Sequence, residues 1–126
     1  MTARLVVCST CRFSEEAPVD AAGLSGGRRF LEAIEEVTRA DDIVDLKIEE
    51  QACLWACVSH CSVYLAEDGK PAYLAGRFAP TASDAQAIIA FARLYAASLG
   101  GAVPYRDWPE GVKGRFIARL PAEGGC

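Results

Sequence analysis

Hydrophobic and polar positions follow one another along the chain in blocks that predict an order of secondary-structure elements. The apolar run in "RLVV", residues 4–7, predicts a buried first strand with Cys8 at its carboxyl end. Phe30, Ile34 and Val37 recur at helical spacing among glutamates, which predicts an amphipathic helix over residues 28–40. The period-two alternation over residues 42–51 predicts a strand with one buried face.

The second half of the chain continues this order. Two β-prone runs on either side of Asp68-Gly69 predict a β-hairpin. Pro80 ends the second run, and Thr81 with Asp84 forms a capping-box pattern that predicts a helix ending at Gly100-Gly101. The predicted apolar stripe of this helix consists of Ala85, Ile88, Ile89, Ala92, Tyr95 and Leu99.

Residues 102–126 show no sustained period beyond a short segment around "GRFIARL", and we expect them to form a tail packed on the body. The order β-α-β-β-β-α predicts a thioredoxin-like α/β fold, with a mixed sheet of about four strands flanked by helices. At 126 residues, the chain is expected to be a single domain, residues 1–126. In a β-α-β unit the carboxyl ends of the two parallel strands meet, so the cysteines that follow each strand become neighbours.

The composition limits the roles that these cysteines can have. The sequence has no apolar segment of membrane-spanning length and no signal-peptide core, so we expect a soluble cytoplasmic protein. In that compartment thiols stay reduced, and clustered cysteines are typical of metal ligands or redox catalysts. The net charge of −4 argues against a nucleic-acid partner. The scattered basic residues Arg106, Lys113, Arg115 and Arg119 are expected to form a solvated face.

Two groups of cysteines carry the candidate site: Cys8 and Cys11 after the first strand, and Cys53, Cys57 and Cys61 after the second. Four thiolates from two loops suit a [2Fe-2S] cluster or tetrahedral zinc. One helical turn would aim Cys53 and Cys57 together, whereas Cys61 enters the next strand and is not needed as a ligand. A thiol-disulfide oxidoreductase is a third interpretation, although no helix begins at "CSTC" to lower a thiol pKa.

Other residues near the cysteines have weaker signals. His60 is the single histidine and is a candidate ligand, but we expect it to be a hydrogen-bonding or exposed side chain near the site. Trp55 and Tyr64 would shield a cluster from water, or would serve as ordinary packing. Gly26-Gly27 lacks the lysine and the preceding strand of a phosphate-binding loop, which favours a helix entry.

Several longer motifs resemble known proteins. "CLWAC", the upstream cysteine pair and "VYLAEDGKPAYL" resemble the thioredoxin-fold [2Fe-2S] ferredoxins. "ACLWACVSHCSVYLAEDGKPAYLAGRF", "AFARLYAAS", "VPYRDWPEGVKGRFIARLP" and "STCR" resemble a bacterial family of unknown function described as ferredoxin-like predicted metal-binding proteins. The ferredoxin pattern implies Cys8, Cys11, Cys53 and Cys57 as ligands, with Cys61 as an alternative in place of Cys11. The resemblance also implies a homodimer and an association with cobalamin or cobalt-related functions.

Together these observations predict a small iron–sulfur protein that transfers electrons and is not itself an enzyme. Its partner would be a redox or metal-handling protein, with no nucleic acid and no membrane involved. A zinc- or cobalt-binding carrier, with Cys61 or His60 completing the site, is the second interpretation. A thiol-disulfide oxidoreductase is the third.

Overall fold

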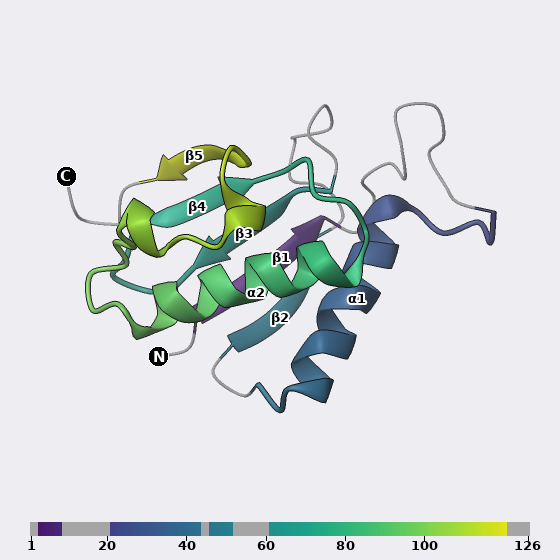
Figure 1. Ribbon diagram of the computed structural model, residues 1–126, viewed down its shortest axis with the longest axis horizontal. Coiled ribbons are helices and arrows are strands. Elements are labelled where there is room, and N and C mark those ends of the chain that lie inside the picture. The colour runs from purple at the N-terminus through teal and green to yellow at the C-terminus, as the bar shows by residue number, and fades with distance from the viewer. Residues whose placement is uncertain (1–2, 9–20, 44–45, 52–60, 121–126) are drawn as a thin grey trace.

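The computed structural model describes residues 3–8, 21–43, 46–51 and 61–120, and Figure 1 shows their arrangement. The strands are β1 (Ala3–Cys8), β2 (Leu46–Gln51), β3 (Val63–Ala66), β4 (Ala72–Ala75) and β5 (Phe116–Leu120). The helices are α1 (Gly26–Ala40) and α2 (Ala82–Ala97), followed by the short 3-10 helices η2 (Tyr105–Asp107) and η3 (Glu110–Val112). The predicted order β-α-β-β-β-α is confirmed. None of the helices in these ranges is long and apolar enough to cross a membrane.

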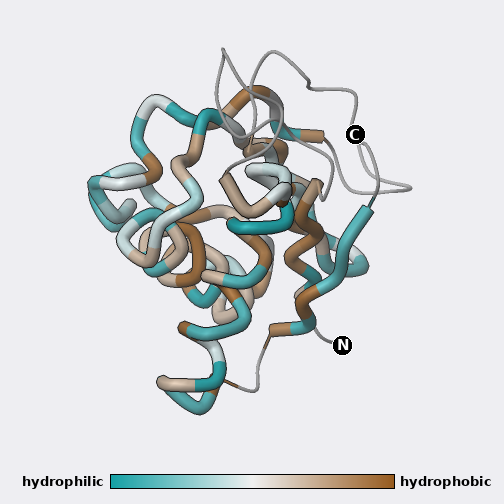
Figure 2. The backbone as a smooth tube through the Cα atoms, turned by 90° about the vertical axis from the view of Figure 1, so that its right-hand side faces the viewer, coloured by the Kyte–Doolittle hydropathy of each residue, from teal (hydrophilic) through white to brown (hydrophobic). Residues whose placement is uncertain are grey.

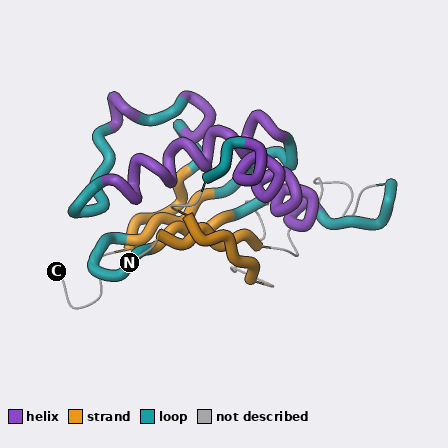
Figure 3. Tube along the Cα trace, turned by 90° about the horizontal axis from the view of Figure 1, so that it is seen from below, coloured by secondary structure: helices purple, strands orange, loops and turns teal. Residues whose placement is uncertain are grey.

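The described strands form one mixed sheet in the order β2-β1-β3-β4-β5. β1 and β2 are parallel, with Cys8 opposite Gln51, while the other neighbouring strands are antiparallel. Both α1 and α2 lie on one face of the sheet (Figure 3). We call the end of the sheet at Cys8 the cysteine end, and the opposite end, where residues 66–72 connect β3 to β4, the hairpin end.

The core lies between this sheet and the two helices. Leu5 and Val7 of β1 belong to one buried cluster with Phe30 and Ile34 of α1, and all four are fully buried. Burying a side chain of this size contributes about 1.5–3 kcal/mol relative to leaving it exposed. Hydrophobic stretches accordingly run through the middle of the molecule in Figure 2, with hydrophilic stretches around them. The core therefore fixes the strand register that places Cys8.

The helix starts follow the local signals. Ser25 is the N-cap of α1, and its Oγ accepts a hydrogen bond from the Arg28 backbone N at 3.1 Å. Gly26 and Gly27 form the first turn of α1 and are buried, which agrees with a helix entry. Thr81 is the N-cap of α2, with its Oγ1 3.3 Å from the Asp84 backbone N.

The capping box of α2 differs from the predicted one in its second half. The Asp84 carboxylate does not return to Thr81; its Oδ2 accepts a hydrogen bond from the backbone N of Ala79 at 2.6 Å. The Thr81 backbone N instead donates to the Ala79 carbonyl at 2.8 Å. The side chain of Asp84 therefore orders the chain before the helix as well as the helix start.

The predicted apolar stripe of α2 is wrong at Leu99. The helix ends at Ala97, before Gly100-Gly101, so Leu99 lies beyond it and is 100% exposed. The stripe also lacked Phe91, which is fully buried. Phe91 contacts Trp108 and Phe116, with ring centroids 5.7 and 4.8 Å away, because the segment after the helix folds back over α2. Phe91 stands three residues after Ile88 and four before Tyr95, so the helical spacing itself was a signal that could have placed it in the stripe.

The C-terminal segment is more than a packed tail. Residues 116–120 form β5, antiparallel to β4, so the described residues make a sheet of five strands where about four were predicted. The pairing is irregular at Leu74 and Ala75: Phe116 lies opposite Ala75 and Ala118 opposite Leu74, which leaves Ile117 without a paired position. This β-bulge interrupts the period-two pattern, which is why the sequence showed no sustained period here beyond the short segment around "GRFIARL".

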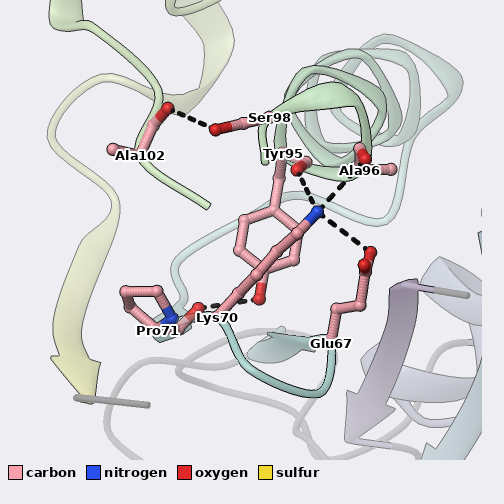
Figure 4. A network of polar contacts seen from close by, with 7 residues as sticks. All are labelled: Glu67, Lys70, Pro71, Tyr95, Ala96, Ser98 and Ala102. Atoms are coloured by element: carbon pink, nitrogen blue, oxygen red, sulfur yellow. Dashed lines mark hydrogen bonds and ion pairs between the residues drawn. The ribbon is translucent and has the colours of Figure 1, made fainter. Parts of the chain in front are cut away.

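At the hairpin end, Lys70 connects the β3–β4 hairpin to the C-terminal end of α2 (Figure 4). Its buried ammonium donates to the carbonyls of Tyr95 and Ala96 at 3.0 and 3.1 Å and lies 3.1 Å from Glu67 Oε1. The Tyr95 hydroxyl donates to the Pro71 carbonyl at 2.7 Å. Since α2 has no basic residue in its last turn, Lys70 supplies from the hairpin the positive charge that a helix C-terminus favours.

Candidate metal centre

Cys8 is the last residue of β1 and is 3% exposed. Its backbone N donates to the Ser62 carbonyl at 3.1 Å, which extends the pairing of β1 with β3 to the strand end. In the parallel register Cys8 lies opposite Gln51, two residues before Cys53 in the sequence. The prediction that the two cysteine groups follow strands ending side by side is thus confirmed as far as Cys8 and Gln51.

The remaining predicted ligands fall outside the described residues. These are Cys11, Cys53 and Cys57, together with His60 and the shielding residue Trp55. Within residues 3–8, 21–43, 46–51 and 61–120, no group of three or more histidine, cysteine, aspartate or glutamate side chains could hold a metal ion. A metal at the cysteine end would therefore need residues of 9–20 and 52–60 in addition to Cys8.

Cys61 differs from Cys8 in its surroundings. It is completely buried and belongs to the hydrophobic core cluster, which does not include Cys8. Burial, with a smaller contribution from the nearby Cys8 and Asp84, raises the pKa of the Cys61 thiol to about 11. In the metal-free chain, Cys61 therefore keeps its proton at neutral pH and packs as a small hydrophobic residue.

The N-terminus of α1 lies at the cysteine end. Arg28 in its first turn forms an ion pair with Glu50 of β2, with Nη2 and Oε2 2.8 Å apart, and Glu50 precedes the residue opposite Cys8. The first turn of α1 contains no acidic residue, although negative charge is the favoured kind there. Arg28 is paired with Glu50, and Arg29 is paired with Glu32, with Nη1 and Oε1 3.3 Å apart, so the preference of this end for negative charge comes from the helix dipole.

The chain after β4 packs across the start of α1. The rings of Phe78 and Phe30 are stacked, with centroids 5.4 Å apart and an interplanar angle of 18°. Arg77 has φ of 63°, a conformation uncommon for a residue with a side chain, and its carbonyl accepts a hydrogen bond from Arg115. The Phe30–Phe78 stacking and the hydrogen bond from Arg115 together hold the loop after β4 at the cysteine end.

The expectation of a solvated basic face is wrong for Arg115. Its Nε donates to the Gly111 carbonyl at 2.7 Å, its guanidinium lies 5.1 Å from the centre of the Phe78 ring, and its Nη2 is 3.6 Å from Asp84 Oδ2. Arg115 thus ties β5 to α2 and to the loop after β4. No sequence signal distinguished it from Arg106 and Arg119, which are exposed.

Tyr64, the second predicted shielding residue, is half-buried on β3 opposite Val6. It lines a concavity of about 490 Å³ with Arg4, Glu67, Asp68 and Lys70. That concavity lies toward the hairpin end, since Lys70 and Glu67 belong to it. Shielding of a metal by Tyr64 stays a prediction.

A family model described as "Protein of unknown function (DUF1636)" matches residues 5–122. The chain belongs to this family. The match agrees with the resemblance to a bacterial family of unknown function inferred from the motifs. No curated protein matches the sequence.

Among solved structures, the DUF1636 chain is similar to a thioredoxin-like [2Fe-2S] ferredoxin from Aquifex aeolicus. The TM-score is 0.59 at 18% sequence identity, and the match covers 94% of this chain and 92% of the ferredoxin. At this identity the likeness establishes the fold, and the predicted thioredoxin-like architecture is confirmed. The second resemblance inferred from the motifs, to thioredoxin-fold ferredoxins, is confirmed at the same level.

Proposed function

We propose that this chain is a small [2Fe-2S] electron carrier, with Cys8, Cys11, Cys53 and Cys57 as the cluster ligands. The observation that carries the proposal is the parallel register of β1 and β2, which brings Cys8 opposite Gln51. Both cysteine pairs then leave adjacent strand ends, although they are more than 40 residues apart in the sequence. The solved ferredoxin with the same fold supports this interpretation.

The donor set fits such a cluster. Two pairs of thiols, each on its own loop, match the need of a two-iron cluster for four thiolates. A bound cluster supplies one-electron transfer, and the chain's own residues provide its electrostatic surroundings. The N-terminus of α1, which has no acidic residue in its first turn, favours the negative charge of four thiolates.

The ligand set with Cys61 in place of Cys11 has less support. Cys61 is fully buried in the core cluster, and its thiol must lose a proton to bind a metal. This is the reason to propose Cys61 as a packing residue beside the site. A carrier of zinc or cobalt that uses Cys61 or His60 is the alternative that the following experiment must exclude.

The test is purification of the full chain without oxygen, followed by visible absorbance, metal and sulfide analysis, and electron paramagnetic resonance after reduction. We expect a coloured protein with equal amounts of iron and acid-labile sulfide. Cys8→Ser should lose the cluster, whereas Cys61→Ser and Cys126→Ser should keep the iron and sulfide content. A colourless protein with zinc and no sulfide would overturn the proposal, and loss of metal in Cys61→Ser would favour the alternative.

Three further parts of the proposal depend on the same site. The chain is a carrier and not a catalyst, so its partner is a redox or metal-handling protein. A thiol-disulfide oxidoreductase would instead require a lowered thiol pKa at Cys8 or Cys11 in the metal-free chain, which thiol alkylation against pH measures. The homodimer and the association with cobalamin or cobalt functions stay predictions from the resemblance, and light scattering tests the first.

A further inference from the structure

A second candidate site lies at the β5 edge of the sheet, away from the cysteines. It is a cavity of about 310 Å³ between β4, β5 and the segment 102–108, lined by Tyr73, Val103, Trp108, Phe116, Ile117 and Arg119. This volume lies at the lower limit of small-molecule sites, which span roughly 300–1,000 Å³. We call it the aromatic cavity. None of its lining residues is a predicted cluster ligand.

The aromatic walls of the cavity are held in place by their polar atoms. Trp108 Nε1 donates to the Val103 carbonyl at 2.9 Å, and the Tyr73 hydroxyl donates to the Gly101 carbonyl at 3.3 Å. The Phe116 ring lies 4.8 Å from Trp108 and 5.4 Å from Tyr73, centroid to centroid. Because the backbone satisfies both ring donors, a ligand meets rings fixed in orientation and has no buried donor to satisfy.

The β-bulge of β5 shapes the opposite wall. In a regular strand, neighbouring side chains point to opposite faces of the sheet. Here Phe116, Ile117 and Arg119 all line the same cavity, because Ile117 occupies the extra position of the bulge. The bulge also leaves Ile117 44% exposed at the cavity. Tyr105, 62% exposed, stands 4.9 Å from the Trp108 ring and extends the apolar surface.

Arg119 is the charged residue of the lining. It is exposed, and in the part of the chain that the structure describes no acidic side chain forms an ion pair with it. Arg115, by contrast, is engaged with Asp84, and Lys113 with Glu110. A guanidinium without an ion-pair partner among the described residues, at the edge of an aromatic cavity, matches a carboxylate, which it can bind through two parallel hydrogen bonds.

We propose that the aromatic cavity binds a small planar aromatic carboxylate. The ring lies against Trp108 and Phe116, and the carboxylate pairs with Arg119. The volume limits the ligand to one ring or two fused rings. The proposal does not depend on the cluster, since the lining residues lie on β4, β5 and the segment 102–108.

The test is a titration of the full chain, as purified, with 2-naphthoate and with the neutral 2-naphthalenemethanol, by calorimetry and by amide and indole NMR shifts. We expect saturable one-to-one binding of 2-naphthoate, with shifts at the Trp108 indole N–H and at the amides of Ile117 and Arg119. Arg119→Gln should raise the Kd about tenfold, the size of one lost charge-assisted hydrogen bond. Arg106→Gln, an equal charge change at an exposed arginine outside the lining, should leave the Kd within about twofold.

Further outcomes separate the parts of the proposal. Ile117→Glu, which adds a negative charge at the cavity, should abolish 2-naphthoate binding while its thermal unfolding and far-ultraviolet circular dichroism stay close to the original. The neutral alcohol should bind about tenfold more weakly than 2-naphthoate and should not respond to Arg119→Gln. Absence of saturable binding, shifts confined to other surfaces, or equal Kd values for the acid and the alcohol would overturn the proposal.

Discussion

The two ends of the sheet differ in how their buried polar side chains are satisfied. At the hairpin end, Lys70 is buried with its ammonium on two helix carbonyls and beside Glu67, so the charge is satisfied inside the chain. At the cysteine end, the buried polar side chains of the described residues are the Ser62 hydroxyl and the thiols of Cys8 and Cys61, and the thiols are weak hydrogen-bonding groups. A buried ammonium demands partners from the fold, whereas a buried thiol is tolerated as a small apolar group.

This difference separates structure from candidate chemistry. The hairpin end has a complete network, and removing any member leaves another buried group unsatisfied. The cysteine end contains groups whose strongest interaction, thiolate to metal, requires something that the fold alone does not supply. Substitutions at the hairpin end should therefore lower the free energy of unfolding and leave metal binding unchanged. Substitutions of the proposed ligand cysteines should abolish metal binding and leave the stability of the metal-free chain nearly unchanged.

The largest effect is expected for Lys70→Met. Removing the ammonium leaves Glu67 partly buried without its cation and two carbonyls without a donor, so the free energy of unfolding should fall by about 3–5 kcal/mol in urea titration. The matched control is Lys47→Met, since Lys47 pairs with Glu49 but is 64% exposed, and it should change stability by less than about 0.5 kcal/mol. Equal losses in the two variants would contradict the network, and loss of metal in Lys70→Met would contradict the separation of the two ends.

Gly101→Ala tests how closely the hairpin end is packed. Gly101 has φ of 78°, and an added Cβ would lie 2.8 Å from Lys70 Cβ and 3.1 Å from Pro71 Cδ. Backbone strain and overpacking together should cost about 2–4 kcal/mol. Gly114→Ala is the control, because Gly114 has φ of 80° and nothing within 4 Å, so it shows the strain alone, about 1–2 kcal/mol. If both variants lost the same free energy of unfolding, the close contact of the added Cβ with Lys70 would contribute nothing to the destabilisation.

Rising alkaline pH should lower the free energy of unfolding, first through Cys61 at the cysteine end and then through Tyr95 at the hairpin end. The pKa of Cys61 is raised to about 11 from 9.0, and that of Tyr95 to about 12 from 10.0, both chiefly by burial. Since the unfolded chain loses these protons first, each contribution is complete below the unfolded pKa and disappears as pH rises through the folded pKa. Cys61 alone should lower the free energy of unfolding of the metal-free chain by about 2 kcal/mol between pH 9 and 11, and Tyr95 adds to this fall above pH 10.

Single variants assign this pH dependence. Cys61→Ala should flatten the fall between pH 9 and 11, whereas Tyr95→Phe should flatten only the part above pH 10. Urea titrations at half-unit steps of pH measure both. A fall that persists unchanged in the two variants would mean that neither group is responsible.

The smallest effect concerns the charges of α1. In the metal-free chain, Arg29→Glu combined with Glu32→Arg keeps the i,i+3 ion pair but places its negative charge in the first turn, and it should raise the free energy of unfolding by about 0.3–1 kcal/mol. Arg39→Glu, in the last turn of the same helix, should lower it by a similar amount. With a cluster bound, the gain from this double variant should shrink or reverse, because the new charge repels the thiolates. An equal gain with and without the cluster would contradict the proposed electrostatic role.

Some elements were predictable because their signals are local. Thr81 caps α2 because its hydroxyl reaches the backbone three residues on, and Asp68-Gly69 forms the hairpin turn, with Gly69 at φ of 83°. The position of Cys8 at a strand end also followed from sequence, since the apolar run stops there. Each of these depends on residues within a few positions of one another.

Other features depended on contacts that no local pattern encodes. Lys70 had no sequence signal for burial, since its partners Tyr95 and Ala96 are 25 and 26 residues away. Arg115 belonged to a set of similar basic residues until the fold brought it to Asp84 and Phe78. The strand β5 was hidden by its bulge, which breaks the period-two pattern.

The sequence by itself determined the order of the elements up to α2, the N-cap of α2 and the expectation that the two cysteine groups follow parallel strands, because hydrophobic period and turn chemistry act over short distances. Tertiary structure decided the difference between Cys8, at the strand end, and Cys61, inside the core cluster. It also decided the fifth strand and the aromatic cavity beside it. Burial and close packing depend on segments far apart in the chain, and those distances are set only when the sheet and helices have assembled.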